Sequence, residues 1–217
     1  MTHILEADGI QLEFDGRKIL SDIYLQCTTG KITGLLGRNG EGKSCLMKII
    51  YGSLKAEKSV RIDKQSQNKA FRQTGLLVYL PQFNFIPASL SLKRIFKDFE
   101  IDYTLFEKRF PEFTSKYTSS VSNLSGGERR LAELYVIVKA AAHFALLDEP
   151  FTHLNPVQIE KIKELLIEEK ASKGFLVTDH MYTQVTAVCD NLYVLAKGKT
   201  HLVKNMLDLE TLGYAKF

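Results

Sequence analysis

The chain has 217 residues, of which 45% are hydrophobic, and its formal net charge at pH 7 is +4. This length can bury one full hydrophobic core, and a mildly basic charge without a clustered face does not indicate a nucleic-acid partner. Cys27, Cys45 and Cys189 are odd in number and far apart, which argues against a disulfide framework or a zinc site and favours a reducing compartment; no apolar stretch is long enough to span a bilayer.

The N-terminal part of the chain predicts antiparallel β structure. Residues 3–6, 10–14 and 22–26 alternate apolar and polar side chains, and Asp15-Gly16 supplies a turn between the last two. The apolar run at 32–36 then predicts a buried strand.

The segment that follows this strand has the pattern G-x-x-x-x-G-K-S and leads into an expected helix at 43–51, which ends at Gly52. Glycines allow the backbone to curl so that several N–H groups converge, and the helix N-terminus adds partial positive charge. Lys43 can reach the β- and γ-phosphates, and the Ser44 hydroxyl can bind Mg²⁺. We therefore predict a nucleoside triphosphate site on Gly37, Arg38, Asn39, Gly40, Glu41, Gly42, Lys43 and Ser44.

The middle of the chain changes from strands to helices. Residues 57–80 indicate a strand pair with a polar connection at 64–69, and the last strand, 78–80, stops at Pro81. From 90 to 120 aromatic and aliphatic residues recur at helical spacing, which favours a helix core over a ligand site.

The C-terminal part of the chain alternates helices and strands. Such alternation is typical of an α/β core with parallel strands and crossover helices. The expected elements are a helix at 126–142, a strand at 144–147, a helix at 156–170, a strand at 175–178, a helix at 181–188 and a strand at 191–196.

Two acids, Asp148 and Glu149, follow the apolar strand at 144–147. Acids at the carboxyl end of a strand lie at the edge of an open sheet, where ligands bind in such folds. We expect Asp148 to hold Mg²⁺ through water and Glu149 to polarise or deprotonate the attacking water.

A second glycine motif, Leu124-Ser125-Gly126-Gly127-Glu128, begins the helix at 126–142 and predicts another anion site. Leu-Ser-Gly-Gly is also the signature of ATP-binding cassette (ABC) ATPases, and the chain resembles that family over essentially its whole length. The motifs also occur in the family's order, namely Phe14, the loop at 37–44, Gln82, the signature, Asp148-Glu149 and His180.

The resemblance implies the fold. It is an α/β P-loop NTPase fold of the ABC type: a RecA-like core with an N-terminal antiparallel β subdomain and an inserted helical subdomain. Residues 1–217 form one ABC ATPase domain, with 1–86 and 124–217 as the nucleotide-binding core and 87–123 as the helical insert.

The resemblance also implies roles for single residues. Phe14 stacks on adenine, Gln82 contacts Mg²⁺ and senses the membrane partner, and His180 contacts the γ-phosphate. Cys45 directly follows the Mg²⁺-binding serine. In this family two cassettes dimerise head to tail, so Ser125, Gly126 and Gly127 bind the γ-phosphate of ATP held by a second ABC subunit, here expected to be an identical copy.

The function implied is the ATP-binding and ATP-hydrolysing subunit of an ABC transporter, with ATP and Mg²⁺ as cofactors. Its partners are integral membrane permease subunits, contacted between Gln82 and the insert at 87–123, and its place is the cytoplasmic face of the membrane. Three runs are similar to the ATPases of lipopolysaccharide export and branched-chain amino-acid uptake: Glu128-Arg129-Arg130, Asp148-Glu149-Pro150-Phe151 and Thr178-Asp179-His180. The alternatives are a soluble non-transport ATPase, such as that of iron–sulfur cluster assembly, and an ATP-gated clamp without turnover.

The chain departs from the family pattern at a few positions. Asn155 stands where the family usually has Asp, which removes a charge and puts coupling across the dimer in question. Glu41 stands where small residues are common, so we expect its side chain to point out of the phosphate cradle. We expect thiol reagents to inhibit through Cys45 and MgATP to protect it.

Overall fold

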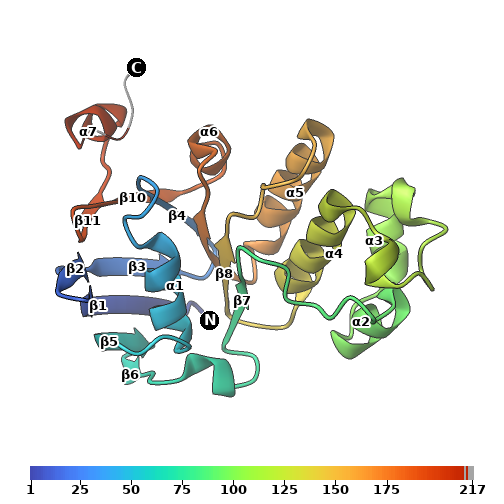
Figure 1. Ribbon diagram of the computed structural model, residues 1–217, viewed down its shortest axis with the longest axis horizontal. Helices are drawn as coiled ribbons and strands as arrows, with labels where there is room; N and C mark the ends of the chain where they lie inside the picture. The colour runs from blue at the N-terminus through green and yellow to red at the C-terminus, as the bar shows by residue number, and fades with distance from the viewer. Residues whose placement is uncertain (213, 215–217) are drawn as a thin grey trace.

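The computed structural model describes residues 1–212 and 214, so residues 213 and 215–217 of the predicted domain lie outside the described part. Within it, the strands form an antiparallel sheet and a largely parallel sheet (Figure 1). The antiparallel sheet contains β1 (Ile4–Phe14), β2 (Arg17–Leu20), β3 (Tyr24–Thr28), β5 (Glu57–Ile62) and β6 (Gln65–Ser66). The second sheet has the order β11-β10-β4-β9-β8-β7 and contains β4 (Ile32–Leu36), β7 (Leu77–Leu80), β8 (Phe144–Asp148), β9 (Gly174–Thr178), β10 (Asn191–Ala196) and the antiparallel edge strand β11 (Lys199–Leu202).

Helices cover both faces of the parallel sheet. The helices are α1 (Lys43–Tyr51), α2 (Leu92–Asp98), α3 (Tyr103–Arg109), α4 (Gly126–Lys139), α5 (Pro156–Glu169), α6 (Tyr182–Thr186) and α7 (Met206–Thr211). Alternation along β8 divides the core: Phe144 and Leu146 pack with α1 and the antiparallel sheet, whereas Ala145 and Leu147 pack with α4 and α5. α1 therefore lies between the two sheets, and its N-terminus opens at the carboxyl ends of the parallel strands.

The aromatic segment folds as the periodicity predicts. Helices α2 and α3 lie beyond α4 (Figure 1), inside the predicted 87–123 insert, whose boundaries stay a prediction. Phe96, Phe106 and Phe110 are each at most 1% exposed, and the Phe106 ring centroid lies 4.8 Å from that of Tyr135 on α4. The prediction that these rings form core is confirmed.

The N-terminal hairpin differs from the prediction. Residues 4–6 and 10–14 belong to one strand, β1 (residue 3 precedes it), whose register with β5 shifts between Asp8 and Gln11, where Gly9 has φ of +57°. The Asp15-Gly16 turn joins β1 to β2, with Phe14 opposite Arg17, and not to the strand expected at 22–26. β2 was not predicted because its four residues, Arg-Lys-Ile-Leu, carry too little alternation to detect.

The ends of several helices and strands also differ from the predicted boundaries. α4 ends at Lys139 rather than at 142, where the buried Lys173 donates from Nζ to the carbonyl oxygens of Val138 and Ala140, both at 2.5 Å. These bonds satisfy carbonyls that a helix C-terminus leaves free. Among the described residues, no helix combines the length and the apolar character needed to cross a membrane.

Candidate nucleotide site

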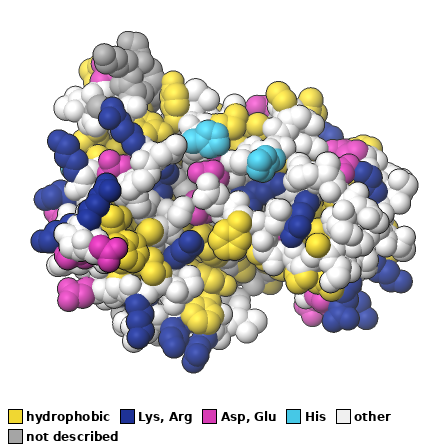
Figure 2. All heavy atoms as spheres, in the orientation of Figure 1, with side chains coloured by type: hydrophobic (Ala, Val, Ile, Leu, Met, Phe, Trp, Pro, Cys, Tyr) yellow, Lys and Arg dark blue, Asp and Glu magenta, His cyan; other side chains and the backbone are white. Residues whose placement is uncertain are grey.

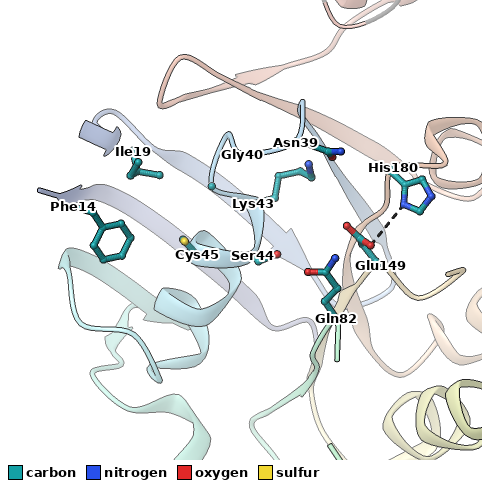
Figure 3. Close-up of a pocket in the computed structure, with 11 residues that line it drawn as sticks. Phe14, Ile19, Asn39, Gly40, Lys43, Ser44, Cys45, Gln82, Glu149 and His180 are labelled. Carbon is teal, nitrogen blue, oxygen red and sulfur yellow. Dashed lines mark ion pairs between the residues drawn. The ribbon is translucent and has the colours of Figure 1, made fainter. Parts of the chain in front are cut away.

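A cavity of about 570 Å³ lies at the N-terminus of α1 (Figure 3). It is lined by Phe14, Ile19, Asn39, Gly40, Gly42, Lys43, Ser44, Cys45, Gln82, Glu149 and His180. All of these except Ile19 were candidates from the sequence. Acidic and histidine side chains gather near the centre of this face in Figure 2. The fold therefore brings distant motifs to one hollow, from the end of β1 to the ends of β7, β8 and β9.

The loop at 37–44 has a backbone that only glycine adopts without strain. Gly40 and Gly42 have φ of +83° and +99°. A Cβ on Gly42 would come within 2.8 Å of Ile19 Cγ2, and one on Gly37 within 2.7 Å of the Leu195 carbonyl oxygen. Gly42 begins α1 without a side-chain cap, so the first N–H groups of the helix face the cavity as an anion site.

Lys43 is held inside the loop that it follows. Its Nζ donates to the carbonyl oxygens of Gly37 (2.7 Å) and Arg38 (3.2 Å), and the residue is 8% exposed. Burial lowers the pKa of Lys43, while Glu149 and Asp148 nearby act to raise it. A cation restrained in this way is placed to bind phosphate oxygens, which are stronger acceptors than carbonyls.

Asp148 lies behind the cavity, 1% exposed, at the end of β8. The Tyr79 hydroxyl donates to its Oδ2 at 3.0 Å, and the Ser44 side chain also bonds to it. Burial raises the pKa of Asp148 while these bonds lower it, and burial beside this carboxylate raises the pKa of Tyr79, which keeps its hydroxyl a donor. Ser44, Asp148 and Gln82 offer hydroxyl, carboxylate and amide oxygens, the hard donor set that suits Mg²⁺.

Glu149 and His180 lie next to each other at one end of the cavity (Figure 3), with Nδ1 of His180 3.7 Å from Glu149 Oε2. The same Nδ1 lies 3.3 Å from Oδ1 of Asp179, a fully buried carboxylate whose pKa is raised by burial. Asp179 accepts from the N–H groups of Phe151 and Met181, which fixes the loop that carries His180. Glu149 has φ of +50°, an uncommon backbone conformation that often marks functional positions.

The opposite end of the cavity is apolar. Phe14 is 47% exposed, and Ile19 and Cys45 lie beside it (Figure 3), which suits the flat face of a base. Ile19 was missed by the sequence reasoning. Its signal was its place just after the Asp15-Gly16 turn, which folds it back beside Phe14.

Arg130 is a second residue that the sequence reasoning missed. It is 2% exposed on α4, and its guanidinium donates to the carbonyl oxygens of Pro81 (2.7 Å), Asp148 (2.7 Å) and Glu149 (2.8 Å). It thereby joins the helix that begins at the signature to the ends of β7 and β8. The available signal was an arginine in the largely apolar stretch at 130–138, whose other charged member is the buried Glu133.

The signature residues lie outside the nucleotide cavity. Ser125 and Gly127 line a separate hollow of about 540 Å³ together with Glu112, Glu128, His153, Asn155 and Gln158. Ser125 accepts from the N–H of Glu128 at 3.3 Å, and the Glu128 carboxylate accepts from the N–H of Ser125 at 2.9 Å. A Cβ on Gly127 would come within 2.6 Å of the His153 carbonyl oxygen, whereas one on Gly126 would meet nothing within 4 Å.

Gly37, Arg38 and Glu41 complete the loop but do not line the cavity. Glu41 Oε2 accepts from the backbone N–H of Lys197 at 2.9 Å. Its side chain therefore points out of the cradle, as expected.

Comparison with known proteins gives consistent matches. The sequence model described as ABC transporter matches residues 20–152. The lipopolysaccharide export system ATP-binding protein LptB of Haemophilus influenzae is 31% identical, over 90% of this chain and 88% of that protein. The xylose/arabinose import ATP-binding protein XylG of Sulfolobus acidocaldarius is 30% identical, over 92% and 87%.

The fold has counterparts among solved structures. One described as a nucleotide-free ATP-binding cassette from an ABC transporter aligns with a TM-score of 0.78 at 22% identity, over 98% of this chain and 96% of that chain. This likeness confirms the predicted fold class.

Proposed function

This chain belongs to the ABC transporter family and is an ATP-binding, ATP-hydrolysing subunit; we propose that it works as a dimer with two ATP molecules enclosed between its copies. The relatives are transporter subunits, which favours this function over a soluble non-transport ATPase. Both an export protein and an import protein are among these relatives, at 31% and 30% identity.

In the proposed complex, the adenine stacks on Phe14 and the phosphates lie on the loop at 37–44. The backbone N–H groups at Gly40 and Gly42 and at the start of α1 point to the phosphate oxygens. Lys43 exchanges the carbonyl oxygens of Gly37 and Arg38 for the β- and γ-phosphates. The exposed face of Phe14 and the uncapped α1 support this arrangement.

Hydrolysis needs a positioned water and stabilised charge. Glu149 takes the proton of the attacking water, and His180 contacts the γ-phosphate from the loop that Asp179 fixes. Ser44, Gln82 and Asp148 would hold Mg²⁺, which neutralises charge on the phosphates when it is bound. The oxygen-only donor set supports this assignment.

The observation that carries the dimer proposal is the separation of the two anion sites. Ser125 and Gly127 line a hollow apart from the cavity that holds Lys43, Glu149 and His180. A signature that binds phosphate therefore needs ATP held by another chain. In that arrangement each cavity is completed by the Ser125, Gly126 and Gly127 of the second subunit.

A charge placed at Ser125 tests this arrangement. Asp and Asn both cap a helix N-terminus well, so either replacement preserves the start of α4. Ser125→Asp adds a negative charge beside the incoming γ-phosphate, and we expect ATPase activity to fall well below that of Ser125→Asn. MgADP binding, which uses the chain's own cavity, should be the same in both variants. Equal ATPase rates in the two variants would contradict the proposal.

The membrane partner is proposed to be a pair of permease subunits on which this chain lies at the cytoplasmic face. Gln82 lines the nucleotide cavity, while the next residue, Phe83, is 64% exposed. A partner seated against Phe83 and the insert would thus be one residue from a nucleotide contact.

A further inference from the structure

Glu41 is an acid in the phosphate loop whose carboxylate contacts another element. Its Oε2 accepts from the backbone N–H of Lys197, in the turn between β10 and β11. We propose that Glu41 is a positioning residue for nucleotide binding. Its hydrogen bond holds the phosphate loop against this turn and, through the turn, against the apolar end of the cavity, where Phe14 and Ile19 lie. The inference rests on the proposed placement of the nucleotide in the cavity of Figure 3.

The turn has a donor to offer. Ala196 and Lys199 pair across the β10–β11 hairpin, and Lys197 and Gly198 between them have φ of +51° and +77°. A two-residue turn of this kind directs the N–H of its first central residue out of the strand ladder. Glu41 supplies the acceptor for that N–H, which in most hairpins points to water.

The β10–β11 turn also contacts the residues that follow β2, next to the apolar end of the cavity. The Gly198 carbonyl oxygen accepts from the N–H groups of Ser21 (2.9 Å) and Asp22 (3.2 Å), and a Cβ on Gly198 would lie 3.0 Å from Ser21 Oγ. These residues directly follow β2, which pairs with the end of β1 that carries Phe14. The turn therefore bridges the parallel sheet, which carries the loop, and the antiparallel sheet, which carries Phe14.

These contacts form a continuous series along one side of the cavity, which begins and ends in the phosphate loop. From Glu41 they pass through the turn to Ser21, then to Ile19 on β2, and Ile19 in turn limits the space at Gly42. The loop contains Gly40 and Gly42, which have the greatest backbone freedom to lose on ordering. Fixing Glu41 between them holds the loop in its binding conformation before the nucleotide arrives, which lowers the cost of binding.

The same contact accounts for an acid in this place. A free carboxylate beside a triphosphate opposes binding by charge repulsion. Here the side chain is directed out of the cavity, and the backbone N–H that it accepts from offsets part of its charge. Two opposite effects thus compete at Glu41, and its replacement distinguishes them.

The test compares Glu41→Ala with Glu41→Gln in the full chain, using MgADP as the probe and calorimetry to measure its Kd. Alanine removes both the acceptor and the charge, whereas glutamine removes the charge and keeps an acceptor. A typical hydrogen bond contributes about 0.5–1.5 kcal/mol, so we expect Glu41→Ala to raise the Kd roughly twofold to twelvefold. Glu41→Gln should recover most of the affinity. Hydrogen exchange at the Lys197 amide, measured without nucleotide, should be faster than in the wild type for Glu41→Ala but not for Glu41→Gln.

Further variants separate this inference from the proposed site. Glu160→Ala is the matched control, since Glu160 lies exposed on α5 with Lys163 as its partner at 2.6 Å. Lys43→Ala should lose MgADP binding; if it binds like the wild type, the site itself is misplaced. If Lys43→Ala fails to bind while Glu41→Ala binds as tightly as the wild type or more tightly, only the role of Glu41 is overturned. If Glu41→Ala and Glu41→Gln weaken MgADP binding equally, the positioning role of Glu41 is also overturned.

Discussion

Replacing Arg130 with Met probes the buried connection between α4 and the ends of β7 and β8. Methionine keeps an unbranched side chain of similar reach but has no donors. The change would strip the carbonyl oxygens of Pro81, Asp148 and Glu149 of hydrogen bonds at 2.7, 2.7 and 2.8 Å. It would also remove a buried cation whose pKa is lowered by burial and whose Nε has no partner among the described residues.

The expected cost follows from these opposing terms. Each bond from a charged donor contributes about 1.5 kcal/mol at the low end of its range, which gives roughly 4–5 kcal/mol for the set. Relief of the buried charge returns about 1–2 kcal/mol, because an apolar replacement avoids its desolvation. We therefore expect Arg130→Met to lower the free energy of unfolding by about 3 kcal/mol, or the Tm by about 6–12 °C for a chain of this size.

The assay is urea unfolding followed by far-UV circular dichroism, since the chain contains no Trp. Arg94→Met is the control, because Arg94 is exposed and pairs with Asp98 one helical turn away, and exposed ion pairs of this kind contribute little to stability. If Arg130→Met loses no more stability than Arg94→Met, the buried connection does not have the energetic role assigned to it.

Other predictions follow from single residues. Burial lowers the pKa of Lys173 from its ordinary value of 10.5 to about 8, so between these pH values the unfolded chain binds more protons than the folded chain. The free energy of unfolding of the wild type, relative to that of Lys173→Met, should therefore rise as the pH increases from about 8 to 10.5. A difference that does not change with pH would contradict this. Burial raises the pKa of Cys45, so its alkylation, followed by site-resolved mass spectrometry, should be slow at pH 7, faster at higher pH and slowed by MgATP; full ATPase activity after complete Cys45 alkylation would refute the expected inhibition. Asn155 caps α5 by accepting from the N–H of Gln158 at 2.9 Å, and Asp can do the same, so Asn155→Asp should fold normally. Because it restores the charge usual in the family at this position, it should raise ATPase turnover. An unchanged or lower rate would contradict this expectation.

The parts of the fold that could be predicted are those whose signal is local. The buried strands at 32–36 and 144–147 and the helices that follow them show clear apolar runs and periodicity. β2 and β11 are four residues long and lie at sheet edges, so their formation depends on partners distant in sequence. The register shift around Gly9 interrupted the alternation of β1 and made one strand look like two.

The candidate site divides in the same way. Contiguous motifs predicted the residues of the loop and the acids after β8, and the fold brings most of them to one cavity. Ile19 and Arg130 were missed, because the local signal at each residue does not specify its contacts, to Gly42 and to the ends of β7 and β8, which exist only in the folded chain. The separation of the signature from the cavity is likewise a property of the fold and not of the motif.

The most direct test of the account is the oligomeric state of Glu149→Gln with MgATP. The substitution keeps the size of the side chain and removes the base proposed for hydrolysis, so bound ATP should persist. We expect light scattering after gel filtration to show a dimer in MgATP and a monomer in MgADP, with ATPase activity lost. A Glu149→Gln chain that binds MgATP yet stays monomeric would contradict the claim that each nucleotide site is completed by a second copy of the chain.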